Sequence, residues 1–132
     1  MSVLFCDTDC ELWYSKAREM NLKVIQMPYT LNGVETMYDL GEHTDFDGFY
    51  NSMKAGAIPI TSGLNEELYY EIFESYFKDG EDILYVAFSS KMSGTFKYLD
   101  SAVAKLSKKY PKARFRKFDT LNISMGAGLL VY

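Results

Sequence analysis

The strongest constraint on the fold is an unalternating apolar run at residues 83–88, followed at once by the hydroxyl-rich stretch Ser-Ser-Lys-Met-Ser-Gly-Thr at residues 89–95. A short apolar run of this kind is typical of a strand that is covered on both faces in a parallel sheet. A helix is predicted next, because apolar side chains recur at helical spacing at Met92, Phe96, Leu99, Val103, Leu106 and Tyr110. The stretch between strand and helix therefore offers hydroxyls, backbone N–H groups and the positive end of a helix dipole, which suit a carboxylate or a phosphate.

Strands and helices alternate along the rest of the chain. Apolar runs predict further strands at residues 2–6, 23–27 and 114–118, and a last apolar segment at 123–132 begins as a helix. Helices are predicted to begin at three capping patterns, Thr8-x-x-Glu11, Thr44-x-x-Asp47 and Asn65 followed by Glu66 and Glu67. This order predicts an α/β domain with a mostly parallel sheet flanked by helices and joined by right-handed crossovers.

A small antiparallel hairpin is predicted at residues 29–36, where Asn32-Gly33 stands between half-apolar flanks. The helix after it carries an apolar stripe at Phe46, Phe49, Tyr50 and Met53, and Gly56 is predicted to end it. The next helix carries its stripe at Leu68, Tyr69, Ile72, Phe73, Tyr76 and Phe77, and ends at Gly80. Both stripes predict helices that each bury one face.

Size and charge exclude several classes of protein. The 132 residues suffice for one domain, and the net charge of −4 argues against a nucleic acid or an anionic membrane surface as partner of the whole molecule. No run of apolar residues is long enough for an integral membrane segment, and the first residues do not resemble a secretory leader, so we expect a cytoplasmic protein. Basic residues do gather between 105 and 117, either as a solvated helix end or as a docking surface for an acidic partner.

The two cysteines, Cys6 and Cys10, predict neither a disulfide framework nor a zinc site, since a second pair of ligands is missing. Cys6 lies in a predicted buried strand, which favours a core thiol.

A second hydroxyl cluster, Thr61-Ser62, precedes the helix that Asn65 caps. Ligands of open α/β sheets bind beyond the carboxyl ends of the strands. If the strands before the two clusters are neighbours, both clusters face one crevice and could bind a carboxylate without any basic residue. The alternative is that both clusters are only helix caps and turns. Asp7 and Asp119, which also follow strands, are predicted to hold loops at the same edge.

A serine nucleophile is disfavoured. Activation of Ser93 needs a general base, yet the one histidine, His43, lies in a polar loop, and no G-x-S-x-G elbow is present. The sequence therefore favours binding over catalysis, and we predict no cofactor and no metal.

Three motifs together resemble the DegV family of fatty-acid-binding proteins. They are Pro59-Ile60-Thr61-Ser62, the hydroxyl stretch at residues 89–95, and Asp119-Thr120 with Ser124, Gly126 and Gly128. The opening Asp7-Thr8-Asp9 is also similar to the end of that family's first strand. The family commonly continues Thr-Ser with Gln-Pro-Ser, whereas this chain has Gly63-Leu64-Asn65, of which Asn65 can still cap the helix.

The resemblance implies a non-enzymatic carrier whose long-chain fatty acid lies between two domains, with its carboxylate held by hydroxyls that match Thr61 and Ser93. The ligand-binding residues expected on this basis are Thr61, Ser62, Ser93, Gly94 and Thr95. Some members present the bound acid to a separate fatty acid kinase, which is therefore a possible partner of this chain.

The resemblance implies members roughly twice as long as this chain, so we expect residues 1–132 to correspond to the N-terminal α/β domain and the second domain to be absent from this chain. The apolar segment 123–132 agrees with this expectation, because it ends with Leu129, Leu130, Val131 and Tyr132 and without a C-cap. An isolated first domain is expected to self-associate through such a surface.

Two other functions are compatible with the residues. One is an acyl or phosphoryl enzyme that binds its substrate at the same anion-binding stretch, residues 89–95, with a general base from the missing region. The other is a protein-interaction domain that uses the apolar C-terminal face and the basic cluster.

Overall fold

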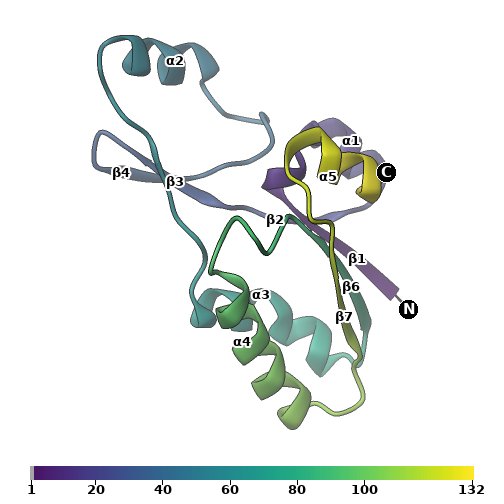
Figure 1. Cartoon of the computed structure of the whole chain (residues 1–132). Helices are drawn as coiled ribbons and strands as arrows, with labels where there is room; N and C mark the ends of the chain where they lie inside the picture. The colour runs from purple at the N-terminus through teal and green to yellow at the C-terminus, as the bar shows by residue number, and fades with distance from the viewer. Residues whose placement is uncertain (1) are drawn as a thin grey trace.

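The computed structural model describes residues 2–132 and contains two sheets (Figure 1). The larger sheet is parallel, with the strand order β2-β1-β6-β7, where β1 is Ser2–Asp7, β2 Lys23–Ile25, β6 Asp82–Ala87 and β7 Phe115–Asp119. The smaller sheet is antiparallel, with the order β4-β3-β5, where β3 is Pro28–Leu31, β4 Val34–Met37 and β5 Ile60–Thr61. The predicted α/β class, the parallel sheet and the antiparallel hairpin are confirmed.

Strand β6, predicted from the apolar run, lies in the interior of the parallel sheet, between β1 and β7. Tyr85 and Ala87 are fully buried on one face. The prediction that both faces are covered is only partly correct, because Leu84 on the other face is 39% exposed and Phe118 of β7 is 50% exposed. Val86 on the same face is buried with Ala127 and Val131 of the C-terminal helix, so this face is covered in part.

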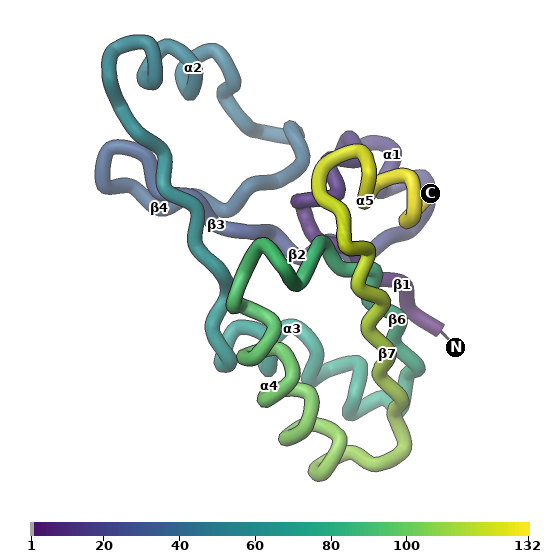
Figure 2. Tube along the Cα trace, viewed as in Figure 1, coloured from purple at the N-terminus to yellow at the C-terminus, as the bar shows by residue number. Residues whose placement is uncertain are grey.

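Two long helices cover the first face of the sheet, α3 at Glu66–Lys78 and α4 at Phe96–Lys109 (Figures 1 and 2). Tyr69, Phe73 and Phe77 of α3 are buried in the larger core, as the spacing predicted. The prediction that Met92 belongs to the α4 stripe is wrong. Residues 89–95 form a loop, and the exposed Met92 lies outside the helix.

The opposite face is covered by a 3-10 turn at Thr8–Cys10, by α1 at Tyr14–Glu19 and by α5 at Ser124–Val131. The predicted capping box at Thr8 is wrong, because its buried hydroxyl accepts a hydrogen bond from the Met27 N–H at 3.0 Å instead. Cys6 is buried in the core, as expected, and Cys10 is buried there as well; both are free thiols.

Residues 28–61 form a lobe that projects away from the parallel sheet (Figures 1 and 2). It holds the small sheet and α2 at Phe46–Lys54. The Asn32-Gly33 turn is confirmed, with positive φ at both residues. Asp45, not Thr44, caps α2 by accepting the Gly48 N–H at 2.9 Å. No residue of α2 is buried, so its apolar stripe faces a cleft rather than a core.

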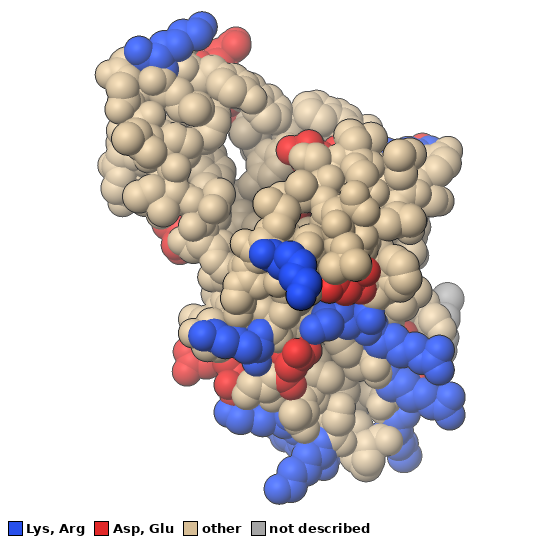
Figure 3. All heavy atoms as spheres, in the orientation of Figure 1, with Lys and Arg blue, Asp and Glu red and all other residues tan. Residues whose placement is uncertain are grey.

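The rest of the molecule, called the body below, carries the basic cluster (Figure 3). Three of these lysines pair with carboxylates, in the pairs Lys105–Glu66, Lys109–Glu74 and Lys117–Asp100. Three of the seven basic residues at 105–117 therefore connect α4 to α3 and β7. Among residues 2–132, no helix has the length and apolar character needed to cross a membrane.

Candidate ligand-binding cleft

A cleft of about 680 Å³ lies between the lobe and the body. The space-filling view shows a hollow in this position (Figure 3). Twenty residues from both parts line it: Thr8, Asp9, Glu11, Met27, Pro28, Tyr29, Tyr38, Thr44, Phe46, Phe49, Tyr50, Pro59, Thr61, Ser62, Gly63, Phe88, Met92, Ser93, Gly94 and Ile123. Most of these are aromatic, methionine, proline or hydroxyl residues, so the cleft combines apolar walls with a polar rim.

The structure brings the two predicted hydroxyl clusters together at this rim. Thr61 and Ser62 line the cleft from β5 and the residue after it, and Ser93 and Gly94 line it from the loop that follows β6. The premise behind the prediction is wrong, however, because the strand that carries Thr61 is not part of the parallel sheet. β5 pairs antiparallel with β3, with Tyr29 opposite Thr61, and the Ser62 N–H donates to the Pro28 carbonyl at 3.2 Å.

Thr95, the fifth predicted ligand-binding residue, is not a lining residue of the cleft. Its side chain is buried behind the rim, where Oγ1 donates a hydrogen bond to the Leu64 carbonyl at 2.9 Å. Its N–H donates to Ser93 Oγ at 3.1 Å. Both polar groups of Thr95 are therefore engaged within the protein, and the structure separates Thr95 from the four other predicted residues.

The loop that carries Ser93 is anchored to the sheet by two aspartates, as predicted. Asp7 is fully buried and accepts hydrogen bonds from the Tyr85 hydroxyl at 2.8 Å and the Phe88 N–H at 3.0 Å. Asp119 accepts the Ser90 N–H at 3.2 Å. Burial raises the pKa of Asp7 to about 6, although the bonds from Phe88 and Tyr85 oppose this shift. The two aspartates thus hold the backbone on either side of Ser89, at Phe88 and at Ser90, where the loop begins.

Sequence reasoning missed the acidic side of the cleft, formed by Asp9 and Glu11. Burial raises the pKa of Asp9, and the nearby charge of Glu11 raises it further. Within residues 2–132, no Lys, Arg or His lines this cleft. A bound anion would therefore be stabilised by hydroxyls and backbone N–H groups of this chain, and not by a basic side chain.

Sequence reasoning also missed the aromatic wall, to which the lobe contributes Tyr29, Tyr38, Phe46, Phe49 and Tyr50. Phe49 packs edge-on against Tyr29 and Tyr50, with ring centroids 5.4 Å apart in both pairs. The apolar stripe on α2 could have indicated this wall. Apolar residues at helical spacing show that one face of a helix is covered, but they do not show whether a protein core or a ligand covers it. A ligand can cover such a face as well as a core can.

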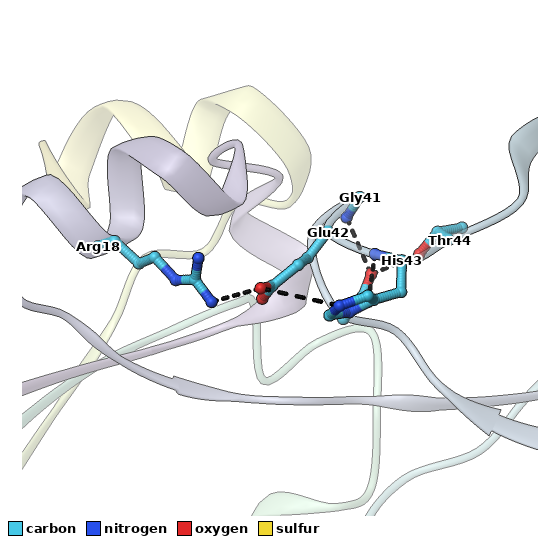
Figure 4. Close-up of polar contacts among 6 residues, drawn as sticks. Arg18, Gly41, Glu42, His43 and Thr44 are labelled. Carbon is cyan, nitrogen blue, oxygen red and sulfur yellow. Dashed lines mark hydrogen bonds and ion pairs between the residues drawn. The ribbon is translucent and has the colours of Figure 1, made fainter.

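His43 lies beside Glu42 (Figure 4) and, unlike Ser93, does not line the cleft. Its ring Nδ1 is 3.1 Å from Asp39 Oδ2, and its side chain is largely exposed rather than directed into the cleft. Arg18 and His43 both approach the carboxylate of Glu42 in the same group. His43 is therefore not placed to act as a general base for Ser93. Among residues 2–132, no three His, Cys, Asp or Glu side chains are grouped to hold a metal ion.

The fold and the cleft define an α/β domain in which a small antiparallel lobe faces the edge of a parallel sheet across an aromatic cleft. A family model described as "Uncharacterised protein, DegV family" matches residues 3–132. The chain belongs to the DegV family.

Curated relatives support this assignment. A DegV domain-containing protein of Clostridium perfringens is 34% identical over 130 residues, which are 98% of this chain and 45% of that protein. Another, from Lactococcus lactis, is 31% identical over 97% of this chain and 44% of its own length. The chain thus spans a little under half the length of these relatives.

Solved structures share the fold. A protein of Eubacterium ventriosum described as stearic-acid-binding superposes with a TM-score of 0.86 at 19% identity, over 99% of this chain and 45% of its own. A DegV family protein of Thermus thermophilus, described by its fatty acid binding, superposes with a TM-score of 0.81 at 21% identity, over 98% of this chain and 44% of its own.

Proposed function

We propose that this chain binds a long-chain fatty acid in the cleft between lobe and body. The observation that carries the proposal is the continuity of an aromatic cleft with a rim of hydroxyls from two separate segments. Such a cleft matches a molecule with a long apolar tail and a small polar head. Its volume of about 680 Å³ is within the ordinary range of small-molecule sites.

The headgroup is assigned to Thr61, Ser62, Ser93 and Gly94, which lie at the rim. Hydroxyl donors form charge-assisted hydrogen bonds with a carboxylate, and each is stronger than a bond between neutral groups. The tail is assigned to the wall formed by α2 and β3, where Phe49 and Tyr29 pack together. Burial of the acyl chain there supplies most of the affinity, since each buried methylene contributes about 0.8 kcal/mol.

Relatives of known structure support this ligand class, because the Eubacterium ventriosum protein is described as stearic-acid-binding and the Thermus thermophilus protein by its fatty acid binding. These relatives are about twice as long, so their remaining residues could complete the site. We further propose that the protein is a carrier rather than an enzyme, since His43 lies away from Ser93. Presentation of the acid to a fatty acid kinase and a cytoplasmic location stay predictions.

The direct test is native mass spectrometry of the protein purified from lipid-replete cells, followed by titration of the delipidated protein with oleate. We expect a co-purifying fatty acid in the wild type. The Ser93→Ala variant should bind more weakly by about 1–3 kcal/mol, because a donor to a buried carboxylate is lost. Ser90→Ala is the matched control, since Ser90 belongs to the same loop but does not line the cleft.

A ligand-free spectrum together with no oleate binding would contradict the proposal. Equal affinities of Ser93→Ala and wild type would remove Ser93 from the headgroup site. A panel of ester and phosphate substrates separates carriage from catalysis, because turnover that disappears in Ser93→Ala would favour an enzyme.

A further inference from the structure

Thr95 joins the two segments that form the rim of the cleft. One segment is residues 61–63, called the first jaw, and the other is residues 92–94, called the second jaw. Thr95 directly follows the second jaw, and its Oγ1 donates to the carbonyl of Leu64, which directly follows the first jaw, at 2.9 Å. These two segments are about 30 residues apart in the sequence, and this side chain bonds them to each other.

Tyr69 completes the connection. The Tyr69 and Thr95 hydroxyl oxygens are 3.0 Å apart, and both side chains are buried. A threonine hydroxyl has a single proton, and Thr95 uses it on Leu64. Tyr69 is therefore the donor in its bond with Thr95. Because Tyr69 comes from the core face of α3, the junction of the jaws is fixed to the body and not to the lobe.

Gly63 allows the jaws to approach closely. A Cβ atom at position 63 would lie 2.8 Å from Thr95 Cβ and 3.5 Å from Ser93 Oγ. The first distance is shorter than side chains tolerate, so a larger residue would push the first jaw away from Thr95. Glycine at this position and threonine at 95 thus set the spacing of the rim together.

Thr95 also directs the Ser93 hydroxyl. The Thr95 N–H donates to Ser93 Oγ at 3.1 Å, which occupies an acceptor position of that oxygen. The Ser93 proton remains available, and Ser93 lines the cleft. A hydroxyl held in this way can donate to a ligand oxygen without first breaking a bond inside the protein.

We infer that Thr95, with Tyr69 and Gly63, is a positioning residue that holds Ser93 and Thr61 at the spacing needed to clamp a fatty acid headgroup. This inference rests on the proposed function. It assigns Thr95 a role behind the site, in place of the contact with ligand that the sequence suggested.

The first experiment measures oleate affinity in variants of the protein. Thr95→Val keeps the side-chain shape but removes the bond to Leu64, and we expect affinity to fall about tenfold. Thr95→Ser keeps the hydroxyl and should stay within about twofold of wild type. Tyr69→Phe should weaken binding severalfold. Tyr70→Phe is its control, because the Tyr70 hydroxyl bonds Glu74 outside the cleft.

A double-mutant cycle separates positioning from general stability. If Thr95 acts through Ser93, Thr95→Val should change affinity by less than about twofold once Ser93→Ala is present. A purely structural role predicts a lower melting temperature, unchanged affinity of the folded protein and no coupling to Ser93. Equal affinities of Thr95→Val, Thr95→Ser and wild type would overturn the inference and leave fatty acid binding standing.

The second experiment needs no ligand, so that it still decides the inference if the wild type binds no fatty acid. Amide hydrogen exchange is measured by NMR for residues 62–64 and 93–95 in wild type, Thr95→Val and Gly63→Ala. We expect exchange in both jaws to become at least about tenfold faster in the two variants, while the β6 amides stay protected. Unchanged exchange in both jaws would overturn the inference.

Discussion

The body and the lobe are stabilised in different ways. The body buries a continuous core of side chains between the parallel sheet and α3 and α4, and it includes five fully buried aromatic or leucine residues: Tyr69, Phe73, Tyr85, Leu99 and Leu106. Between residues 28 and 61, by contrast, only Pro28 and Leu40 are buried, and Leu40 packs into the body. The lobe has no core of its own, so its conformation depends on its attachments to the body.

This difference shows how the fold can present an apolar cleft to solvent. An amphipathic helix such as α2 normally buries its apolar face against a core. Here that face lines the cleft instead. The body supplies stability, and the lobe supplies a wall that can adjust to a ligand. Local opening is expected where few apolar contacts are buried, which places it in the lobe.

The largest expected effect comes from truncating one aromatic side chain in each region. Phe73→Ala removes a ring that packs against Phe5 at 5.0 Å and Phe115 at 5.1 Å between centroids. We expect a loss of about 3–5 kcal/mol in the unfolding free energy. Phe49→Ala in the lobe should cost only about 1 kcal/mol. Chemical denaturation checks both, and equal losses would show that the lobe has a core after all.

The next prediction concerns pH and Asp7 in the body. Its folded-state pKa, about 6, lies above the usual value of 3.8, so the folded state binds the proton more tightly than the unfolded chain. The stabilisation is complete below about pH 4 and is lost as the pH rises through about 6. Relative to Asp7→Asn, wild-type stability should fall by up to about 3 kcal/mol from about pH 4 to pH 7. Parallel pH profiles of the two proteins would contradict this.

Asp39, which accepts hydrogen bonds from Gly41, His43 and Thr44 within the lobe, is expected to respond in the opposite direction. Burial acts to raise its pKa, but hydrogen bonds from Thr44 and His43 outweigh burial and hold the pKa below its usual value. Its stabilisation is present at neutral pH and is lost as the pH falls through that lowered pKa. Hydrogen exchange at acidic pH should therefore increase first around residues 39–44, and Asp39→Asn should abolish this pH dependence. An equal increase of hydrogen exchange in lobe and body at acidic pH would contradict this prediction.

A smaller effect is expected at the contact between Trp13 of the body and Phe46 of the lobe, whose rings stack with centroids 6.1 Å apart. Gly41 approaches the same indole closely, since a Cβ there would lie 2.4 Å from the ring. Trp13→Ala should cost about 1 kcal/mol. Hydrogen exchange should show the loss mainly in the lobe. Loosening confined to α1 would show that Trp13 does not couple the two regions.

The smallest effect is expected at the ion pair between Arg18 and Glu42, which also joins body and lobe (Figure 4). Both side chains reach solvent, and such pairs contribute about 0.5 kcal/mol. Arg18→Ala should lower stability by this amount at low salt and by less at high salt. A salt-independent loss well above 1 kcal/mol would mean that the arginine acts by packing.

Local patterns predicted most elements correctly. The apolar run at 83–88 predicted β6, and Asn32-Gly33 predicted the hairpin. Asn65 caps α3, as predicted, by accepting the Leu68 N–H at 2.9 Å. The errors occurred where side chains found distant partners. Thr8 matches a capping pattern, yet its hydroxyl bonds Met27, nineteen residues away. A capping pattern states only which local bonds are possible, and the tertiary fold chooses among them.

The sequence by itself determined that two hydroxyl clusters stand next to helices, because turn and cap preferences depend on neighbouring residues. Only the tertiary structure decided how those clusters meet. The β5–β3 pairing and the contact of Gly63 with Thr95 bring them together, although their strands are not neighbours in the parallel sheet. The same contact turns Thr95 inward while Ser93, two residues earlier, lines the cleft. The direction of each hydroxyl depends on partners from distant parts of the chain, and local sequence preference does not specify those partners.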